Sequence, residues 1–250
     1  MPETYIRIVG AAIIFLIVFF VTSIFPKFDK LTQSGNWHNG LPPVMALEFL
    51  SDPNDVGSIV KSEEARDDLK KAVEMDTWQI VPVYGILFLL LCLVLFFRTD
   101  SLFGQAAPYW AIVAVALTVG ACAGDVIENN NTVTLLQKLR FANGSVITES
   151  VDPALIKTIS LASHFKFALV FACAFILSFL FLQFPLKETG WSYGFQILSS
   201  LIFLSLILCS IVGLAGLFRH TLVPPAMKFL YLAGLAAAVC FLFAPRLYSR

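Results

Sequence analysis

The chain has 250 residues, with 17 basic and 17 acidic side chains, so its formal net charge is zero. Hydrophobic residues make up 58% of the chain and charged residues only 14%, whereas a soluble domain carries about a quarter charged residues. A chain this apolar would expose too much hydrocarbon to water, which predicts an integral membrane protein surrounded by membrane lipids. The balanced charge does not indicate a nucleic-acid partner.

Six apolar runs are long enough to cross the hydrocarbon as helices, which takes about 20 residues each. Proline or charged residues separate them, as at Pro26 and Pro185. The predicted fold class is therefore an all-α integral membrane protein with about six transmembrane helices and both termini on one side. The expected spans are residues 6–25, 80–97, 106–127, 165–184 and 195–218, and a sixth between Pro225 and Pro245.

Three of these helices are predicted to extend beyond the bilayer on one side. Ser62 is a suitable N-cap for a helix ahead of the second span, and residues 131–141 continue the third span without a breaker. Asp152 and Pro153 begin a helix that runs into the fourth span. We predict a single helical membrane domain, 1–250, with a long extramembrane loop containing short helices at 26–77. A helical extension at 128–164 links the third and fourth spans.

Two acidic residues follow a small-residue face at the end of the third span (GACAGDVIEN, 120–129). Gly120 and Gly124 form a GxxxG pair, which lets another helix approach closely. Asp125 and Glu128 continue that face, so both carboxylates are predicted to face another helix. Acids at a membrane boundary are costly when unpaired and mark functional candidates. Because these two lie at the last membrane turn of the helix, structural capping or pairing is the favoured explanation.

Other titratable residues are expected at the same membrane level, namely Asp76, His164, Lys166 and His220. Lys166 is expected to snorkel or to pair with an acid. The candidates for catalysis are Asp76, Asp125, Glu128 and His164. The candidates for binding a divalent metal are Asp125, Glu128, His164 and His220. This metal pattern is unspecific, because no helix supplies two ligands at a known spacing, and no cofactor is indicated.

The stretch GDVIEN (124–129) resembles a motif, Asp-x-x-Glu-Asn, that ends a small-residue span in a loosely defined group of uncharacterised bacterial polytopic membrane proteins. Residues 46–56 (ALEFLSDPNDV) and 76–85 (DTWQIVPVYG) are similar to that group as well. The likeness covers the first four spans. It implies a bacterial inner (cytoplasmic) membrane and no known activity, and it singles out Glu48, Asp76, Asp125, Glu128 and Asn129.

Three functions are compatible with these features. The leading hypothesis is a non-enzymatic membrane protein, a subunit or scaffold of an assembly, with a protein partner or a second copy of the chain. The second is a membrane-embedded enzyme acting on a lipid or amphipathic substrate, possessing acid–base or metal chemistry. The third is a small transporter or ion carrier whose carboxylates bind protons or cations. A salt bridge at Asp125 and Glu128 would favour the first, and a bound metal the second.

Overall fold

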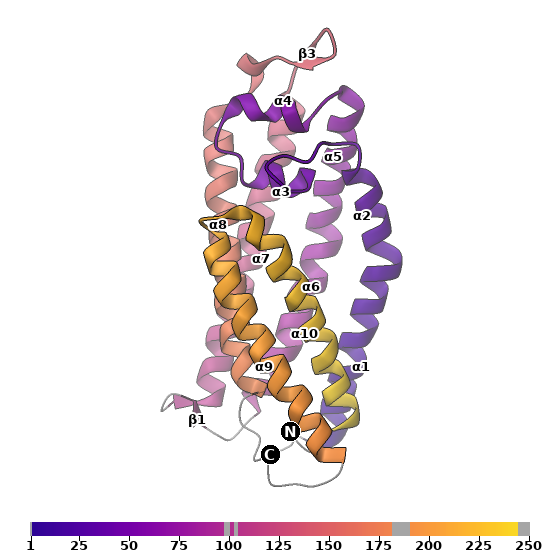
Figure 1. The fold of residues 1–250 in the computed structure, drawn as a ribbon, viewed down its shortest axis with the longest axis vertical. Helices are drawn as coiled ribbons and strands as arrows, with labels where there is room; N and C mark the ends of the chain where they lie inside the picture. The colour runs from indigo at the N-terminus through magenta and orange to yellow at the C-terminus, as the bar shows by residue number, and fades with distance from the viewer. Residues whose placement is uncertain (1, 98–100, 103–104, 182–190, 245–250) are drawn as a thin grey trace. The chain divides into compact units, whose positions relative to one another are not determined.

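The structure is a computed structural model that describes residues 2–97, 101–102, 105–181 and 191–244, and it is almost entirely helical (Figure 1). Among these residues, six helices are long and apolar enough to cross a membrane. This confirms the predicted fold class, an all-α polytopic membrane protein. The six run over Glu3–Thr32, Glu63–Phe96, Ala107–Lys138, Pro153–Phe181, Trp191–Gly216 and His220–Phe243. The predicted breaks at Pro185 and Pro245 lie outside the described residues.

The spanning helices expose large apolar side chains along their length. Phe15 is 68% exposed and Leu232 is 64% exposed. Isolated apolar residues are common on soluble proteins, but continuous apolar surfaces of this kind are not. Lipid is therefore the solvent that matches these helices.

The first membrane helix continues beyond the predicted end at Pro26. It consists of α1 (Glu3–Phe19), a π-helical turn η1 (Phe20–Ile24) and α2 (Phe25–Thr32). Proline lacks the amide hydrogen that an α-helix requires, but Pro26 lies in the first turn of α2, directly after the π turn. The i→i−4 ladder is already interrupted there, so the helix passes through proline. Four helices, rather than the three predicted, are thus longer than a bilayer requires.

The second membrane helix has the same construction. It consists of α5 (Glu63–Met75), a π turn η3 (Asp76–Ile80) and α6 (Val81–Phe96), with Pro82 just after the π turn. Ser62 caps α5 as predicted, because its hydroxyl accepts a hydrogen bond from the Ala65 amide at 3.1 Å. The two π turns contact one another. Asp76 is the first residue of η3.

Helices α7 (Ala107–Lys138) and α8 (Pro153–Ser178, continued by the 3₁₀ turn η5, Phe179–Phe181) form the third and fourth spans. Asp152 caps α8 as expected, accepting a hydrogen bond from the Ala154 amide at 2.9 Å. Helix α7 ends at Lys138, three residues short of the predicted 141. A hairpin of β3 (Phe141–Ala142) and β4 (Ser145–Val146) follows, then a 3₁₀ turn η4 (Thr148–Ser150).

The remaining elements are the last two spans and several short helices and strands. Helix α9 (Trp191–Gly216) forms the fifth span, and η6 (His220–Leu222) with α10 (Val223–Phe243) forms the sixth. A second hairpin pairs β1 (Ser101–Leu102) with β2 (Gln105–Ala106). The loop after α2 carries α3 (Pro43–Glu48), η2 (Pro53–Asp55) and α4 (Val56–Ile59).

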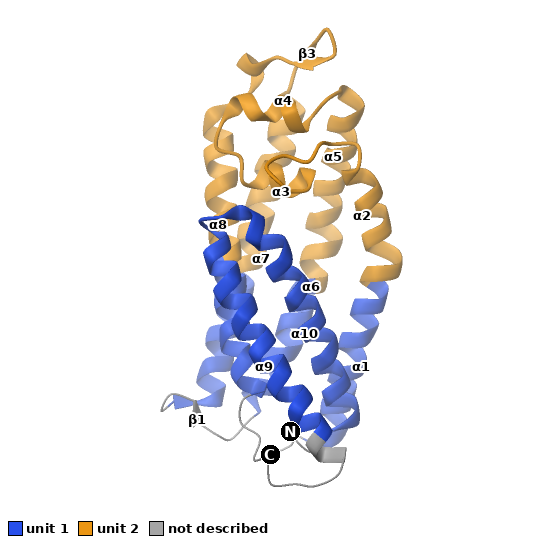
Figure 2. Ribbon diagram, in the orientation of Figure 1, with its two compact units in different colours: residues 1–19, 84–120, 168–250 blue, residues 20–83, 121–167 orange. Residues whose placement is uncertain are grey.

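The chain divides into two compact units (Figure 2). Unit 1 comprises residues 1–19, 84–120 and 168–250, and in it α10 packs against α1 and α9. Unit 2 comprises residues 20–83 and 121–167. The whole loop predicted at 26–77 and the whole extension predicted at 128–164 belong to unit 2. Its core includes the fully buried Leu47, Leu69 and Leu136.

Candidate functional site

The short helix α3 brings a carboxylate into the core of unit 2. The helix begins at two prolines, with Pro42 in the extended conformation that precedes a helix. Ala46 and Leu47 are buried, and Glu48 at the C-terminal end is only 5% exposed. A carboxylate at this depth requires charged or hydrogen-bonding partners.

Lys166 of α8 is the main partner. Its Nζ lies 2.8 Å from Glu128 Oε2 and 2.9 Å from Asp125 Oδ1, both on α7. Glu48 Oε2 lies 3.4 Å from the same nitrogen. The side chain of Lys166 is buried, so it does not snorkel to solvent. The alternative expectation, pairing with an acid, is confirmed, and three acids take part.

Asn129 and Ser163 extend this group at either end. The Asn129 amide nitrogen donates to Asp76 Oδ2 at 2.9 Å and to Asp125 Oδ1 at 3.4 Å, which uses both of its hydrogens. The Ser163 hydroxyl lies 2.8 Å from Glu128 Oε2. A continuous chain of polar contacts thus joins η3, α7 and α8. We call this group the lysine cluster: Glu48, Asp76, Asp125, Glu128, Asn129, Ser163 and Lys166.

Helical spacing and a glycine place the α7 side chains against α8. Asp125, Glu128 and Asn129 follow one another at i, i+3 and i+4, so they share one face of the helix. A Cβ at Gly124 would lie only 3.3 Å from Lys166 Cβ. Glycine therefore permits the close approach on which the contacts with Lys166 depend. The prediction that Asp125 and Glu128 face another helix is confirmed.

Aromatic rings lie beside the cluster. The ring of Phe49, which follows α3, stacks on Phe167 at 5.5 Å between centroids. Lys166 Nζ is 4.9 Å from the centroid of the Phe167 ring, a favourable cation–π position. The rings restrict water around the ammonium, which strengthens its attraction to the carboxylates.

The structure brings three of the four catalytic candidates together, namely Asp76, Asp125 and Glu128. His164 lies at the edge, where its ring packs edge-on against Phe49 and its Nδ1 is 2.6 Å from Ser160 O. His220 begins η6 in unit 1, whereas the lysine cluster belongs to unit 2.

Two members of the cluster were not predicted in the roles that they have. Lys166 was expected to snorkel or to pair with an acid, but not to contact three carboxylates. Ser163 was not singled out, although it lies three residues before Lys166 on α8 and therefore on a neighbouring part of the same face. All five residues that the resemblance singles out belong to the cluster.

The charges in the cluster are unbalanced. The cluster has four carboxyl groups and a single ammonium group, which contacts three of them, and all five side chains are at most 8% exposed. Burial raises the pKa of the Glu48 carboxyl well above its ordinary value, and the charge of Glu128 raises this pKa further while Lys166 opposes the rise. Within the part of the chain that the structure describes, Glu128 Oε1 has no hydrogen-bond partner, and Glu48 Oε2 has only its ion pair with Lys166.

The ammonium of Lys166 lies among the carboxylate oxygens, where a bound cation would otherwise lie. Among the described residues, no three or more His, Cys, Asp or Glu side chains are arranged to hold a metal ion. The metal hypothesis for Asp125, Glu128, His164 and His220 stays a prediction.

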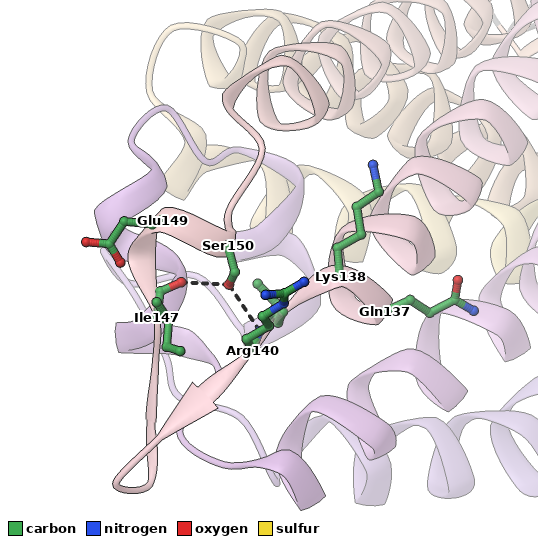
Figure 3. Close-up of a pocket in the computed structure, with 7 residues that line it drawn as sticks. Gln137, Lys138, Arg140, Ile147, Glu149 and Ser150 are labelled. Carbon is green, nitrogen blue, oxygen red and sulfur yellow. Dashed lines mark hydrogen bonds between the residues drawn. The ribbon is translucent and has the colours of Figure 1, made fainter.

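A separate pocket of about 600 Å³ lies at the surface, near the hairpin between α7 and α8. Figure 3 shows the Ser150 side chain closing this loop: its hydroxyl accepts from the Arg140 amide at 3.0 Å and donates to Ile147 O at 2.6 Å. The lining includes both basic and acidic side chains, Lys138, Arg140 and Glu149. This mixture defines no class of ligand, so the lysine cluster is the better candidate for a functional site.

No family model matches the chain, and comparisons with curated proteins and with solved structures find no match either. The class of the protein is therefore defined by its fold and by the lysine cluster: it is a polytopic helical membrane protein with a buried, acid-rich charge network.

Proposed function

We propose that the chain is a non-enzymatic subunit or scaffold of a membrane assembly, in which the lysine cluster is a structural network. The observation that carries this proposal is that Lys166, a residue of the chain itself, supplies the positive charge for three of the four acids. A buried network of this kind favours one arrangement of its elements over others more than it adds stability.

The network holds a loop segment against membrane helices. Glu48 belongs to α3, whereas Asp125 and Glu128 belong to α7 and Lys166 to α8. The loop between α2 and α5 is thereby fixed to α7 and α8, and its outer surface becomes a defined shape. Trp37 in this loop is 69% exposed. Exposed tryptophan is typical of protein contacts and of the membrane interface.

The test is to purify the full chain in mild detergent, measure its native mass and analyse it for metals. Asp125→Asn and Glu128→Gln are the test variants, and Glu74→Gln is the control, because Glu74 is an exposed acid on α5. We expect no stoichiometric metal, a wild-type mass above that of one chain, and dissociation in both test variants only. Stoichiometric metal that both test variants lose would contradict the proposal and favour a metal-dependent enzyme.

A further inference from the structure

The lysine cluster contains more negative charge than its own residues can neutralise. If every group were ionised, four carboxylates and one ammonium would leave three excess negative charges. An unmatched buried charge is costly, and such groups take up a proton or a cation instead. A proton or cation in addition to Lys166 would remove this imbalance.

Glu128 is the group at which this requirement is clearest. It is 0% exposed, and none of the described residues forms a hydrogen bond with its Oε1. Its other oxygen, Oε2, already contacts Lys166 Nζ. A buried carboxylate oxygen without a donor is a costly arrangement, whereas a protonated carboxyl group carries no net charge.

The contacts of Ser163 point to a proton at the same place. Its hydroxyl oxygen lies 2.8 Å from Glu128 Oε2 and 2.9 Å from Ile159 O. A hydroxyl group has one hydrogen, so Ser163 can donate a full hydrogen bond to only one of these two acceptors. A proton on Glu128 removes the conflict, because Glu128 then donates to Ser163 while Ser163 donates to Ile159.

We propose that the lysine cluster is a proton-binding site, in which Glu128 holds a proton and the remaining acids exchange protons with solvent. This goes beyond the proposed scaffold role, which requires only that the network be intact. The ligand is the proton itself, which needs no coordination sphere and fits a site whose centre is filled by an ammonium group.

Exchange is expected from the loop side of the cluster. Asp76 and Glu48 keep 8% and 5% exposure, whereas Glu128 has none. Glu48 is the last residue of the six-residue helix α3, so a small displacement of α3 would open its carboxylate to water. Asp76 connects to Asp125 through Asn129, and Asp125 to Glu128 through Lys166.

The charged groups that act on Glu48 come from three elements. Asp76 belongs to η3, Asp125 and Glu128 to α7, and Lys166 to α8. Helices α4 and α5 also pack against α3, and their buried residues are apolar, namely Val56, Ile59, Ala65, Leu69, Ala72 and Val73. Of the groups that act on Glu48, Lys166 carries the positive charge. We therefore assign the additional positive charge to protons.

The test is infrared spectroscopy of the full chain in detergent, recorded from acidic to alkaline pH in H₂O and in D₂O. A protonated carboxyl group has a carbonyl band of its own that shifts in D₂O. We expect this band in the wild type at neutral pH, a progressive loss as the pH rises, and a reduced band in Glu128→Gln. The control Glu74→Gln, at an exposed position, should leave the band unchanged.

Three results would overturn the proposal. They are a wild-type spectrum without the band at neutral pH, a band unaffected by substitution of each of the four acids, and a band abolished by Na⁺ or Ca²⁺ at constant pH. The last would identify a metal cation as the ligand. If Glu128→Gln does not fold, wild-type protein with ¹³C-labelled glutamate replaces it. The label must shift the band if a glutamate carries the proton. Loss of assembly bears on the scaffold role and leaves this band unaffected.

Discussion

The ammonium nitrogen of Lys166 lies 2.8 Å from Glu128 Oε2, and the two side chains are 5% and 0% exposed. A lysine near the end of a membrane span usually extends toward the headgroups and water. Lys166 instead turns inward, where Asp125 and Glu48 also lie within 3.4 Å of its nitrogen. The position of this one side chain links α8, α7 and the loop helix α3.

Replacing Lys166 with methionine should strongly destabilise the fold. Removal of the ammonium leaves its carboxylates buried and unpaired, which costs about 3–5 kcal/mol when one partner of a buried ion pair is lost. The measurement is thermal or denaturant unfolding in detergent. Lys157→Met is the matched control, because Lys157 is exposed on the same helix.

A double variant separates charge from packing in this experiment. Glu128→Gln added to Lys166→Met replaces a carboxyl group that has lost its contact with the ammonium by a group that cannot ionise, so it should recover part of the lost stability. Equal stability of Lys166→Met and Lys157→Met would show that the contacts of Lys166 have no energetic importance.

Asn129→Asp should also destabilise the protein, and increasingly so as the pH rises. The substitution preserves shape but replaces the amide donor shared by Asp76 and Asp125 with a third acid, at a cost of about 1–3 kcal/mol. Each rise in pH favours ionisation of this added carboxyl beside two others, which increases the repulsion. The control is Asn130→Asp at the exposed neighbouring position. A deficit that is the same in both variants would contradict the bridging role of Asn129.

Much of the membrane architecture could be predicted from the sequence because hydropathy and length decide it. The inward orientation of Asp125 and Glu128 was also predictable, because Gly124 and helical spacing determine one face of α7. The continuation through Pro26 was not, since it depends on the π turn Phe20–Ile24, whose hydrogen bonding leaves no clear mark in a single sequence.

The full cluster could not be predicted from the residues alone. Glu48 lies on a six-residue helix, too short to show a periodic pattern, and it meets Lys166 118 positions further along the chain. The burial of Lys166 depends on acids from three separate segments. The resemblance singled out Glu48, but it did not imply that an ammonium group would lie between the acids.

Cysteine accessibility should show the alternation of the six spans. With the native cysteines replaced, a cysteine at Gln105 should be labelled from the side opposite to cysteines at Asn143 and Asp52. Gln105 follows the second span, whereas Asn143 follows the third and Asp52 the first. An impermeant reagent applied to sealed vesicles of known orientation makes the measurement. Labelling of all three from one side would contradict the six-span topology.

Gly213→Ala should destabilise unit 1. A Cβ at this position would overlap the ring of Phe171, which is fully buried and cannot easily move. Overpacking of this kind costs about 1–3 kcal/mol. Gly194→Ala on the same helix is the control, because a Cβ there would have no described atom within 4 Å. Alanine at Gly194 should be neutral or stabilise the helix by about 0.5–1 kcal/mol. A neutral Gly213→Ala would show that Phe171 does not pack tightly there.

The pH dependence of stability should report on Glu48. Because the folded-state pKa of this carboxyl is raised well above its ordinary value of 4.5, the folded protein binds its proton more tightly than the unfolded chain does. The resulting stability is fully present below the ordinary value and is lost as the pH rises toward the raised pKa. Glu48→Gln cannot ionise, so it should gain free energy of unfolding relative to the wild type as the pH rises above the ordinary value of 4.5.

Unfolding curves of both proteins at a series of pH values provide the measurement, and the difference between them isolates Glu48 from the other acids. Glu74→Gln is again the control, because Glu74 is exposed beside Lys70 on α5 and its substitution should leave the difference near zero. The opposite sign, with the wild type gaining on Glu48→Gln as the pH rises, would mean that attraction to Lys166 outweighs burial. Glu48 would then be ionised in the folded protein, and the exchange of protons at α3 would have to be abandoned.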